Sequence, residues 1–216
     1  FADRQASEGH HNPGVITVST RLANRCVEIR VRDTGTGILK EIRTRIFDPL
    51  GMRDTLAESA TEPIPNRATF YFPRFAADPR YGLHLMRPID YSCYAGASVF
   101  LSTPSDLVRF GMAISSGKLL QPATVQLLQA PQQLASGQET GYGLGWDLET
   151  VELAGSQTRW VGHAGTSLGG MVASLMTFPE HGIVVSVTSN ISYADTSAVA
   201  FKIAQAFADQ GRAGRK

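Results

Sequence analysis

The last third of the chain changes hydrophobic period in a way that few folds accommodate. Apolar and polar residues alternate over residues 141–148, 158–162, 170–178 and 183–190. Such alternation predicts β-strands, because successive side chains of a strand point to opposite faces. Pro179-Glu180-His181-Gly182 separates the last two segments by a tight turn, so these two strands are expected to form a hairpin.

The period then becomes helical over residues 196–210, which predicts a C-terminal amphipathic helix. The residues expected to face inward are Val199, Phe201, Ile203, Ala206 and Phe207. Upstream, Thr103 followed by Pro104 predicts the start of another helix with Thr103 as its N-cap, and Gly117 ends it. Pro122–Leu128 predicts a shorter helix. Helices and strands in separate runs indicate an α+β fold.

The first half of the chain is less regular. Residues 14–20 and 26–32 alternate at period two and predict a hairpin. Residues 40–47 have helical spacing, and this helix is expected to stop at Pro49. Residues 51–94 predict a long irregular segment wrapped over a core, because linkers are poor in the Phe and Tyr residues found there.

Composition excludes several classes of partner. The chain has 216 residues and a net charge of +1, which favours neither nucleic acid nor an anionic membrane as a partner. No apolar run approaches the roughly 18–20 residues that span a bilayer. The N-terminal residues do not follow the pattern of a signal peptide, and the chain does not begin with Met, so we expect the natural start to be missing. No compartment is assigned.

Short motifs in and beside the predicted strands resemble those of a known family. Tyr142-Gly-Leu-Gly-Trp146, then Gly162-His-Ala-Gly165, then residues 178–185 and Ser189-Asn190 follow one another in the order found in class C β-lactamase and penicillin-binding-protein-like serine hydrolases. Residues 95–110 and Ile46-Phe-Asp-Pro-Leu-Gly-Met-Arg-Asp-Thr55 resemble the same family. The resemblance covers about residues 46–210. It implies a β-lactamase/transpeptidase-like antiparallel sheet flanked by helices, in truncated form.

The same resemblance implies site residues. His163-Ala164-Gly165 corresponds to the family's Lys/His-Thr-Gly triplet on an edge strand, and the backbone N–H of Thr166 would be an oxyanion-hole donor. Gly165 would let a substrate approach the backbone closely, and Tyr142 would form part of the substrate-binding wall. His163 is the candidate proton-transfer group, and Ser167 is the candidate nucleophile beside it.

Two motifs of that family are not found where its order requires them. The Ser-x-x-Lys and Tyr motifs lie before the Ile-Phe-x-Pro-Leu-Gly-Met segment in the family, and residues 1–45 contain neither. Ser115-Ser-Gly-Lys118 is a formal Ser-x-x-Lys, but it falls at a predicted helix end. Gly165-Thr-Ser-Leu-Gly169 is a formal Gly-x-Ser-x-Gly elbow, but strands are expected on both sides of it, where the elbow needs a strand followed by a helix.

The N-terminal part resembles a different family. Residues 10–49, with Asp33-Thr-Gly-Thr-Gly37, resemble the ATP-binding domain of sensor histidine kinases, in which the Asp of this motif holds the adenine amino group. The kinase helix that carries magnesium and the later Gly-rich lid are absent, so no ATP binding is expected. We therefore expect a chimaera, with a hairpin and Gly loop in residues 1–45 and the hydrolase-like region in residues 46–216. The hairpin is expected to fill a vacated edge of the sheet.

Two functions remain open at this point. The first is weak hydrolysis of an ester, lactone or β-lactam, with a small-molecule ester or amide as substrate. The second is a non-catalytic remnant that persists as an oligomeric scaffold. No cofactor is expected, and the histidines show no metal-binding spacing. A homo-oligomer is expected, because an exposed apolar face left by a missing domain favours association.

Overall fold

The computed structural model describes residues 16–23, 26–33, 43–58, 63–74, 78–87, 89, 100–167 and 170–213. The chain divides into two compact units, residues 1–39 and 40–216, and each is described by itself.

The first unit contains a β-hairpin. Strand β1 (Ile16–Ala23) pairs antiparallel with β2 (Cys26–Asp33), from Ile16 opposite Asp33 to Ala23 opposite Cys26. The predicted hairpin is confirmed. Strands β1 and β2 form a two-stranded sheet, and the expectation that this hairpin fills an edge of the larger sheet stays a prediction. Each strand pairs with the other along its whole length. The Gly loop after Asp33, residues 34–38, lies outside the described residues.

The second unit holds the remaining elements. In chain order they are η1 (Arg43–Phe47), α2 (Asp48–Leu50), β3 (Leu56–Ala57), β4 (Tyr71–Pro73), η2 (Pro79–Tyr81), β5 (Leu83–Leu85), β6 (Phe100–Leu101), α3 (Pro104–Ser115), α4 (Pro122–Leu128), β7 (Asp147–Leu153), β8 (Ser156–Ser167), β9 (Met171–Phe178), η3 (Pro179–His181), β10 (Ile183–Ser189) and α5 (Thr196–Ala213).

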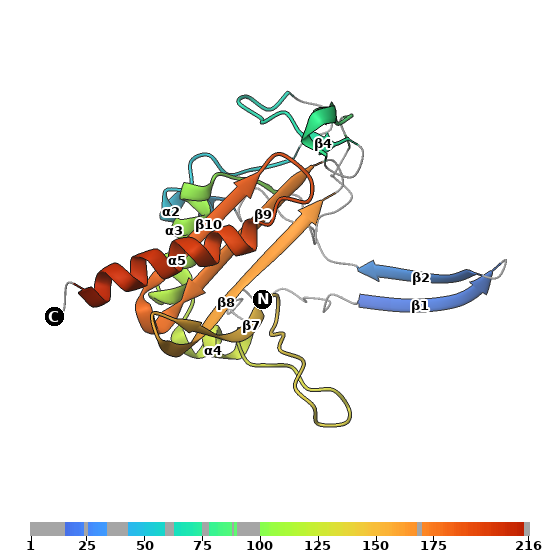
Figure 1. Cartoon of the computed structure of the whole chain (residues 1–216). Helices are drawn as coiled ribbons and strands as arrows, with labels where there is room; N and C mark the ends of the chain where they lie inside the picture. The colour runs from blue at the N-terminus through green and yellow to red at the C-terminus, as the bar shows by residue number, and fades with distance from the viewer. Residues whose placement is uncertain are drawn as a thin grey trace. The chain divides into compact units, whose positions relative to one another are not determined.

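Four of these strands form an antiparallel sheet in the order β10-β9-β8-β7 (Figure 1). Strands β7 and β8 are joined by two residues, Ala154 and Gly155, with φ angles of 50° and 74°. Two successive positive φ angles are the signature of a type I′ turn, whose twist matches that of the strands it joins. Strands β9 and β10 are joined through η3 and Gly182, as the sequence predicts.

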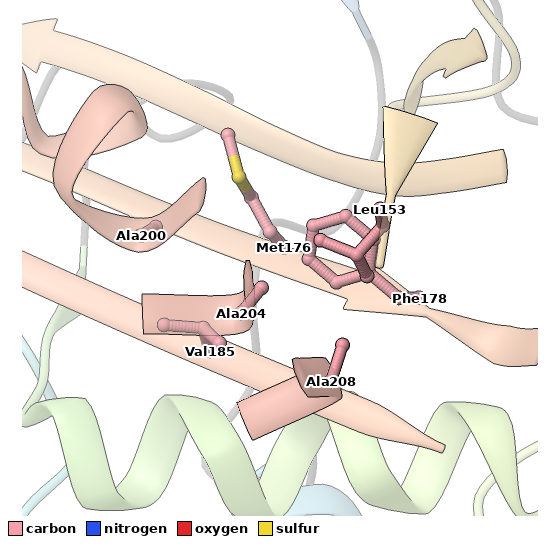
Figure 2. Close-up of a cluster of buried hydrophobic side chains, with 7 residues drawn as sticks. All are labelled: Leu153, Met176, Phe178, Val185, Ala200, Ala204 and Ala208. Atoms are coloured by element: carbon pink, nitrogen blue, oxygen red, sulfur yellow. The ribbon is translucent and has the colours of Figure 1, made fainter. Parts of the chain in front are cut away.

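Helix α5 covers one face of this sheet with small side chains (Figures 1 and 2). The buried cluster between them comprises Leu153, Met176, Phe178, Val185, Ala200, Ala204 and Ala208. Burial of one of its large side chains stabilises the fold by about 2–3 kcal/mol. The predicted inward face of this helix was wrong in part, since Val199 and Phe207 are 48% and 63% exposed and Ala206 is exposed as well. The sheet contributes the bulky groups, so the helix approaches it with alanines.

Helix α3 packs on the opposite face of the sheet. A Cβ on its Gly111 would lie 2.8 Å from Val184 Cγ1 and 3.2 Å from Leu175 Cδ1, so a glycine is needed for this close approach. Leu175 alternates along β9 with Met176, which faces α5, and this places α3 on the other side. The helix begins as predicted, with the Thr103 hydroxyl accepting a hydrogen bond from the backbone N–H of Asp106.

The segment predicted as a strand over residues 141–148 is mostly a turn. Gly141 and Gly145 have φ angles of 68° and 83°, and β7 begins only at Asp147. Alternation in Tyr-Gly-Leu-Gly-Trp mimics a strand, but left-handed glycines reverse the chain there.

The helix predicted to stop at Pro49 instead continues past it. The described part of that helix is the π-helical turn η1, which runs directly into α2 and ends at Gly51 with φ 68°. Pro49 lies in the first turn of α2, where the helix does not require its missing N–H.

Candidate functional site

The candidate site is the end of strand β8 that extends beyond its neighbour. Strand β7 pairs with β8 only as far as Asp147 opposite Gly162, whereas β9 pairs with β8 up to Ser167. Within the described part of the chain, residues 163–167 therefore have a strand on one side only. A strand edge of this kind presents unpaired backbone groups that can bind an extended ligand.

The type I′ turn decides which backbone groups face that open edge. The residues that flank such a turn, here Leu153 and Ser156, form a hydrogen-bonded pair, and every second residue of β8 after Ser156 points its N–H and C=O toward β7. Beyond the end of β7 this parity continues to Ala164 and Thr166. Their N–H and C=O groups consequently face the open edge.

The side chains of β8 alternate between the two faces of the sheet, so those of His163 and Ser167 lie on the face opposite to those of Ala164 and Thr166. Val161 packs against Ile114 of α3, so His163, Gly165 and Ser167 also stand on the α3 face. A Cβ added to Gly165 would meet nothing within 4 Å, so the space above this residue is open. The structure thus leaves room for a ligand against the backbone at the predicted position.

His163 makes its side-chain contact with Tyr142. The Nε2 atom of exposed His163 lies 3.1 Å from the hydroxyl of Tyr142, which is 37% exposed. The two rings meet edge to face, with centroids 6.0 Å apart and an interplanar angle of 77°. Two of the predicted site residues are therefore brought together at the open edge.

Tyr142 is positioned by the turn that precedes β7. Its carbonyl accepts a hydrogen bond from the N–H of Gln132 at 2.8 Å, and the N–H of Gly143 donates to the carbonyl of Trp146 at 2.7 Å. A Cβ on Gly143 would overlap the carbonyl oxygen of Leu128, so only glycine fits. Trp146 is buried in the core beneath α3 and α4, and it anchors this turn.

Ser167 is not brought together with His163. Both residues lie in the continuous strand β8, four residues apart, which corresponds to about 13 Å between their Cα atoms. Strands flank Ser167 on both sides in sequence, so the Gly-x-Ser-x-Gly segment is not an elbow. At the formal Ser-x-x-Lys, Ser115 ends α3 and the ammonium of Lys118 hydrogen-bonds to the carbonyl of Pro49 at 3.4 Å, so this segment is structural.

A buried carboxylate was missed by sequence reasoning. Asp106 is fully buried; its Oδ2 accepts hydrogen bonds from the N–H of Asp54 at 2.9 Å and from the hydroxyl of Thr55 at 2.8 Å. Its Oδ1 accepts a third from Arg109 at 2.6 Å. The pattern Thr103-x-x-Asp106 marks a helix start, but it does not reveal that the carboxylate turns inward and fixes the segment after α2.

Sequence similarity identifies the family to which the chain belongs. The sequence profile described as "Beta-lactamase" matches residues 28–209, which is most of the chain. The chain belongs to the Beta-lactamase family. The α+β fold with an antiparallel sheet and flanking helices is the one that this family's solved structures share with the chain.

Among relatives of this β-lactamase-family chain are the serine beta-lactamase-like proteins LACTB, mitochondrial, of Mus musculus and Homo sapiens. The mouse protein is 27% identical over 78% of this chain and 36% of its own length, and the human protein is 26% identical over 76% and 35%. The chain thus spans about a third of the length of these relatives.

Two solved structures resemble this chain in fold. A D-stereospecific amidohydrolase from Streptomyces sp. superimposes with a TM-score of 0.60 at 21% identity, over 76% of this chain and 47% of that one. A D-amino acid amidase from Ochrobactrum anthropi SV3 superimposes with a TM-score of 0.57 at 26% identity, over 81% and 51%. The chain spans about half of each.

The family match begins earlier than the residues that carry the resemblance in the sequence. It starts at Glu28 and therefore includes most of strand β2 and residues 28–49 of the segment assigned above to a kinase-like fragment. The β-lactamase-like assignment holds for the C-terminal region and extends N-terminally of residue 46.

The described groups with a shifted pKa are Asp78, Arg80 and Glu180. The side chain of Arg80 holds the pKa of Asp78 below its ordinary value, and Asp78 raises the pKa of Arg80 in turn. Partial burial alone would raise the pKa of Glu180, but hydrogen bonds from backbone amides and from the Thr158 hydroxyl outweigh it and lower that pKa.

In the described residues, no group of three His, Cys, Asp or Glu side chains is placed to hold a metal ion. None of the described helices is both long and apolar enough to cross a membrane.

Proposed function

We propose that this chain contributes the substrate-binding edge and a proton-transfer pair to the hydrolysis of small-molecule esters, lactones, β-lactams or amides. The observation that carries the proposal is the unpaired end of β8 at residues 163–167, which lies directly beside the hydrogen-bonded pair of His163 and Tyr142. A backbone edge and an exposed imidazole on one strand suit the binding and protonation of an acyl group.

The chemistry follows from the directions of these groups. The outward N–H of Thr166 is available to donate to a carbonyl oxygen, whose negative charge grows as a nucleophile attacks. A water molecule would lose its proton through the Tyr142 hydroxyl to Nε2 of His163 and attack the carbonyl carbon. Collapse of the tetrahedral intermediate breaks the bond to the leaving group, which takes the proton back from the imidazolium.

Ser167 retains only a limited part in this proposal. As a nucleophile it would need a base within hydrogen-bonding reach, and the length of extended strand between it and His163 does not provide one. We propose the water route as the main path, with labelling of Ser167 as its test.

The second candidate function is a non-catalytic scaffold that self-associates. The separation of Ser167 from His163 favours it, and so does the exposed apolar strip of α5 that includes Val199 and Phe207. A homo-oligomer would appear in light scattering after size exclusion, and Phe207→Lys would shift it toward the monomer.

The experiment that separates these functions is turnover of p-nitrophenyl butyrate and nitrocefin by the purified chain. We expect slow turnover that His163→Ala abolishes and Tyr142→Phe lowers, whereas the matched control His84→Ala, which removes another exposed imidazole, leaves it unchanged. Turnover that is absent, or equal in all variants, removes the hydrolase proposal. Labelling by a fluorophosphonate, located by mass spectrometry, would identify Ser167 or another residue as a covalent nucleophile and replace the water route.

For the N-terminal segment we propose a separate origin. The resemblance of residues 10–49 to the ATP-binding domain of sensor histidine kinases supports a chimaera in which the motif at Asp33 no longer binds nucleotide. Thermal unfolding with and without ATP and Mg²⁺ is expected to coincide. A nucleotide-dependent rise in Tm that Asp33→Asn removes would contradict that loss of function.

A further inference from the structure

A groove of about 730 Å³ lies on the α5 face of the sheet, on the opposite side of β8 from the His163 side chain. Its volume is within the range of roughly 300–1,000 Å³ that is typical of small-molecule sites. The lining groups that matter are Asp147 and Glu149 of β7, Trp160 and Ala164 of β8, Met176 of β9 and Phe201 of α5.

A glycine in the middle of β8 explains the hollow. Gly162 lies opposite Asp147 on one side and opposite Met176 on the other, so these three residues form one row across the sheet. Only Asp147 and Met176 carry side chains in this row, so the surface of the sheet has a gap at Gly162. Trp160 and Ala164 lie two residues before and two residues after Gly162 on β8. A Cβ at Gly162 would overlap the carbonyl oxygen of Leu175, so the gap cannot be closed by substitution without moving β9.

The apolar walls of this groove are held in place by contacts of their own. The indole N–H of Trp160 donates to Glu149 Oε2 at 2.8 Å, which fixes the ring on the sheet. The ring of Phe201 lies 6.3 Å from that of buried Phe178, which fixes it against the core. Two rigid aromatic groups and a flexible thioether from Met176 suit a flat or short-chain apolar body.

The charge of the groove has one sign. Asp147 and Glu149 are two residues apart on β7 and therefore stand on the same face, and none of the described residues that line the groove is Lys, Arg or His. The N-terminus of α5 adjoins the groove at Ser197 and Ala198, but the Asp195 carboxylate accepts the N–H of Ala198 at 2.9 Å and offsets the positive end of that helix. The groove therefore attracts a cation.

We propose that this groove binds an amphipathic organic cation, namely a primary ammonium group carried on an aromatic or short alkyl body. The ammonium group lies between the carboxylates of Asp147 and Glu149. The apolar body lies over Gly162 against Trp160 and Phe201, where an aromatic face also attracts the cation. This site is independent of the proposed hydrolysis, because it uses the other face of β8.

The probes that test the proposal share one skeleton and differ in charge. They are 2-phenylethylammonium, 2-phenylethanol and 3-phenylpropionate, measured against the full chain by calorimetry and by tryptophan fluorescence. We expect the ammonium compound to bind about five- to tenfold more tightly than the alcohol at low salt, as a partly exposed ion pair allows. We expect the carboxylate compound to bind more weakly than the alcohol, and the ammonium preference to shrink as salt is added.

Variants then locate the site. Asp147→Asn and Glu149→Gln are each expected to reduce the ammonium preference several-fold while leaving the alcohol's affinity unchanged. Glu152→Gln is the matched control, since Glu152 lies on the same strand but is exposed on the other face. Ala164→Leu, which fills the groove, should weaken the ammonium and alcohol compounds together. Equal affinity for all three probes, no binding at all, or an equal effect of Glu152→Gln and the two groove variants would each overturn the proposal.

Discussion

Replacement of Asp106 by alanine should destabilise the second unit more than any exposed substitution near it. The carboxylate is fully buried and accepts hydrogen bonds from Asp54, Thr55 and Arg109. It thereby joins the segment that follows α2 to the first turn of α3. The same segment adjoins the cluster of Phe47, Leu50, Met52 and Ala113, so its release would loosen that packing as well.

The magnitude follows from what each partner loses. A hydrogen bond to a charged group contributes roughly 1.5–3 kcal/mol, and removal of one partner of a buried pair costs about 3–5 kcal/mol. Here the loss is moderated, because the Thr55 hydroxyl keeps a second contact at 2.8 Å with Ser102 and the Arg109 side chain is 49% exposed and can turn to water. We therefore expect Asp106→Ala to lower the free energy of unfolding by about 3 kcal/mol, and Asp106→Asn, which retains the acceptor but not the charge, by about 1–2 kcal/mol.

The assay is urea unfolding followed by tryptophan fluorescence. Both tryptophans, Trp146 and Trp160, lie in residues 40–216, so the signal reports on the unit that contains Asp106. With an m-value of about 2–3 kcal/mol/M, the expected loss lowers the midpoint by about 1–1.5 M. Asp54→Ala is the control, because it removes an exposed carboxylate but keeps the backbone N–H that Asp106 binds. A loss below about 1 kcal/mol for Asp106→Ala, or one equal to that of the control, would refute the reasoning.

Three further outcomes test the packing and charge of the sheet. Gly162→Ala should lower the free energy of unfolding by at least about 2 kcal/mol, or prevent folding, because its Cβ would overlap the Leu175 carbonyl. Gly165→Ala on the same strand should leave the unfolding midpoint unchanged and lower only the turnover of p-nitrophenyl butyrate. Ser174→Ala should raise stability by up to about 1 kcal/mol in the same unfolding assay, since the residue is 1% exposed and its hydroxyl has no hydrogen-bond partner among the described residues. A loss of stability would mean that the hydroxyl has a partner in solution. Because the pKa of Glu180 is lowered from 4.5 in the folded state, its contribution to the free energy of unfolding is present above pH 4.5 and is lost as the pH falls. The Glu180→Gln variant should therefore be less stable than the unchanged protein by a few tenths of a kcal/mol at about pH 7. The unfolding curves of the two proteins should converge near about pH 3, and a difference that does not depend on pH would contradict this.

Strong periodicity made parts of the fold predictable. The strands around the Pro179–Gly182 turn and the helix Pro122–Leu128 follow from local pattern, since alternation or helical spacing there agrees with the tertiary packing. The α5 face was misjudged because hydrophobicity ranks Val199 and Phe207 above alanine, whereas the bulk of the sheet decides which side chains fit between the layers. The turn before β7 was missed because glycines of positive φ do not disturb an alternating pattern of letters.

The sequence could name candidate residues for the site but not their arrangement. The motif names His163, Gly165 and Thr166 as candidates, and the structure adds that the edge beside them is open because β7 begins only at Asp147. The contact of His163 with Tyr142 depends on the turn geometry of the intervening chain, which no spacing rule contains. Ser167 was expected to lie beside His163 because only four residues separate them in the sequence, but in an extended strand those four residues span about 13 Å.

The two proposals place different chemistries on neighbouring residues of strand β8, since His163 stands on one face and Ala164 on the other. An insertion or deletion of a single residue between Trp160 and His163 would turn the imidazole into the acidic groove and the methyl group onto the hydrolytic side. Both proposed activities would then fail in one genetic step, although every motif would remain readable in the sequence. The number of residues in this strand is accordingly under tighter constraint than the identity of most of them.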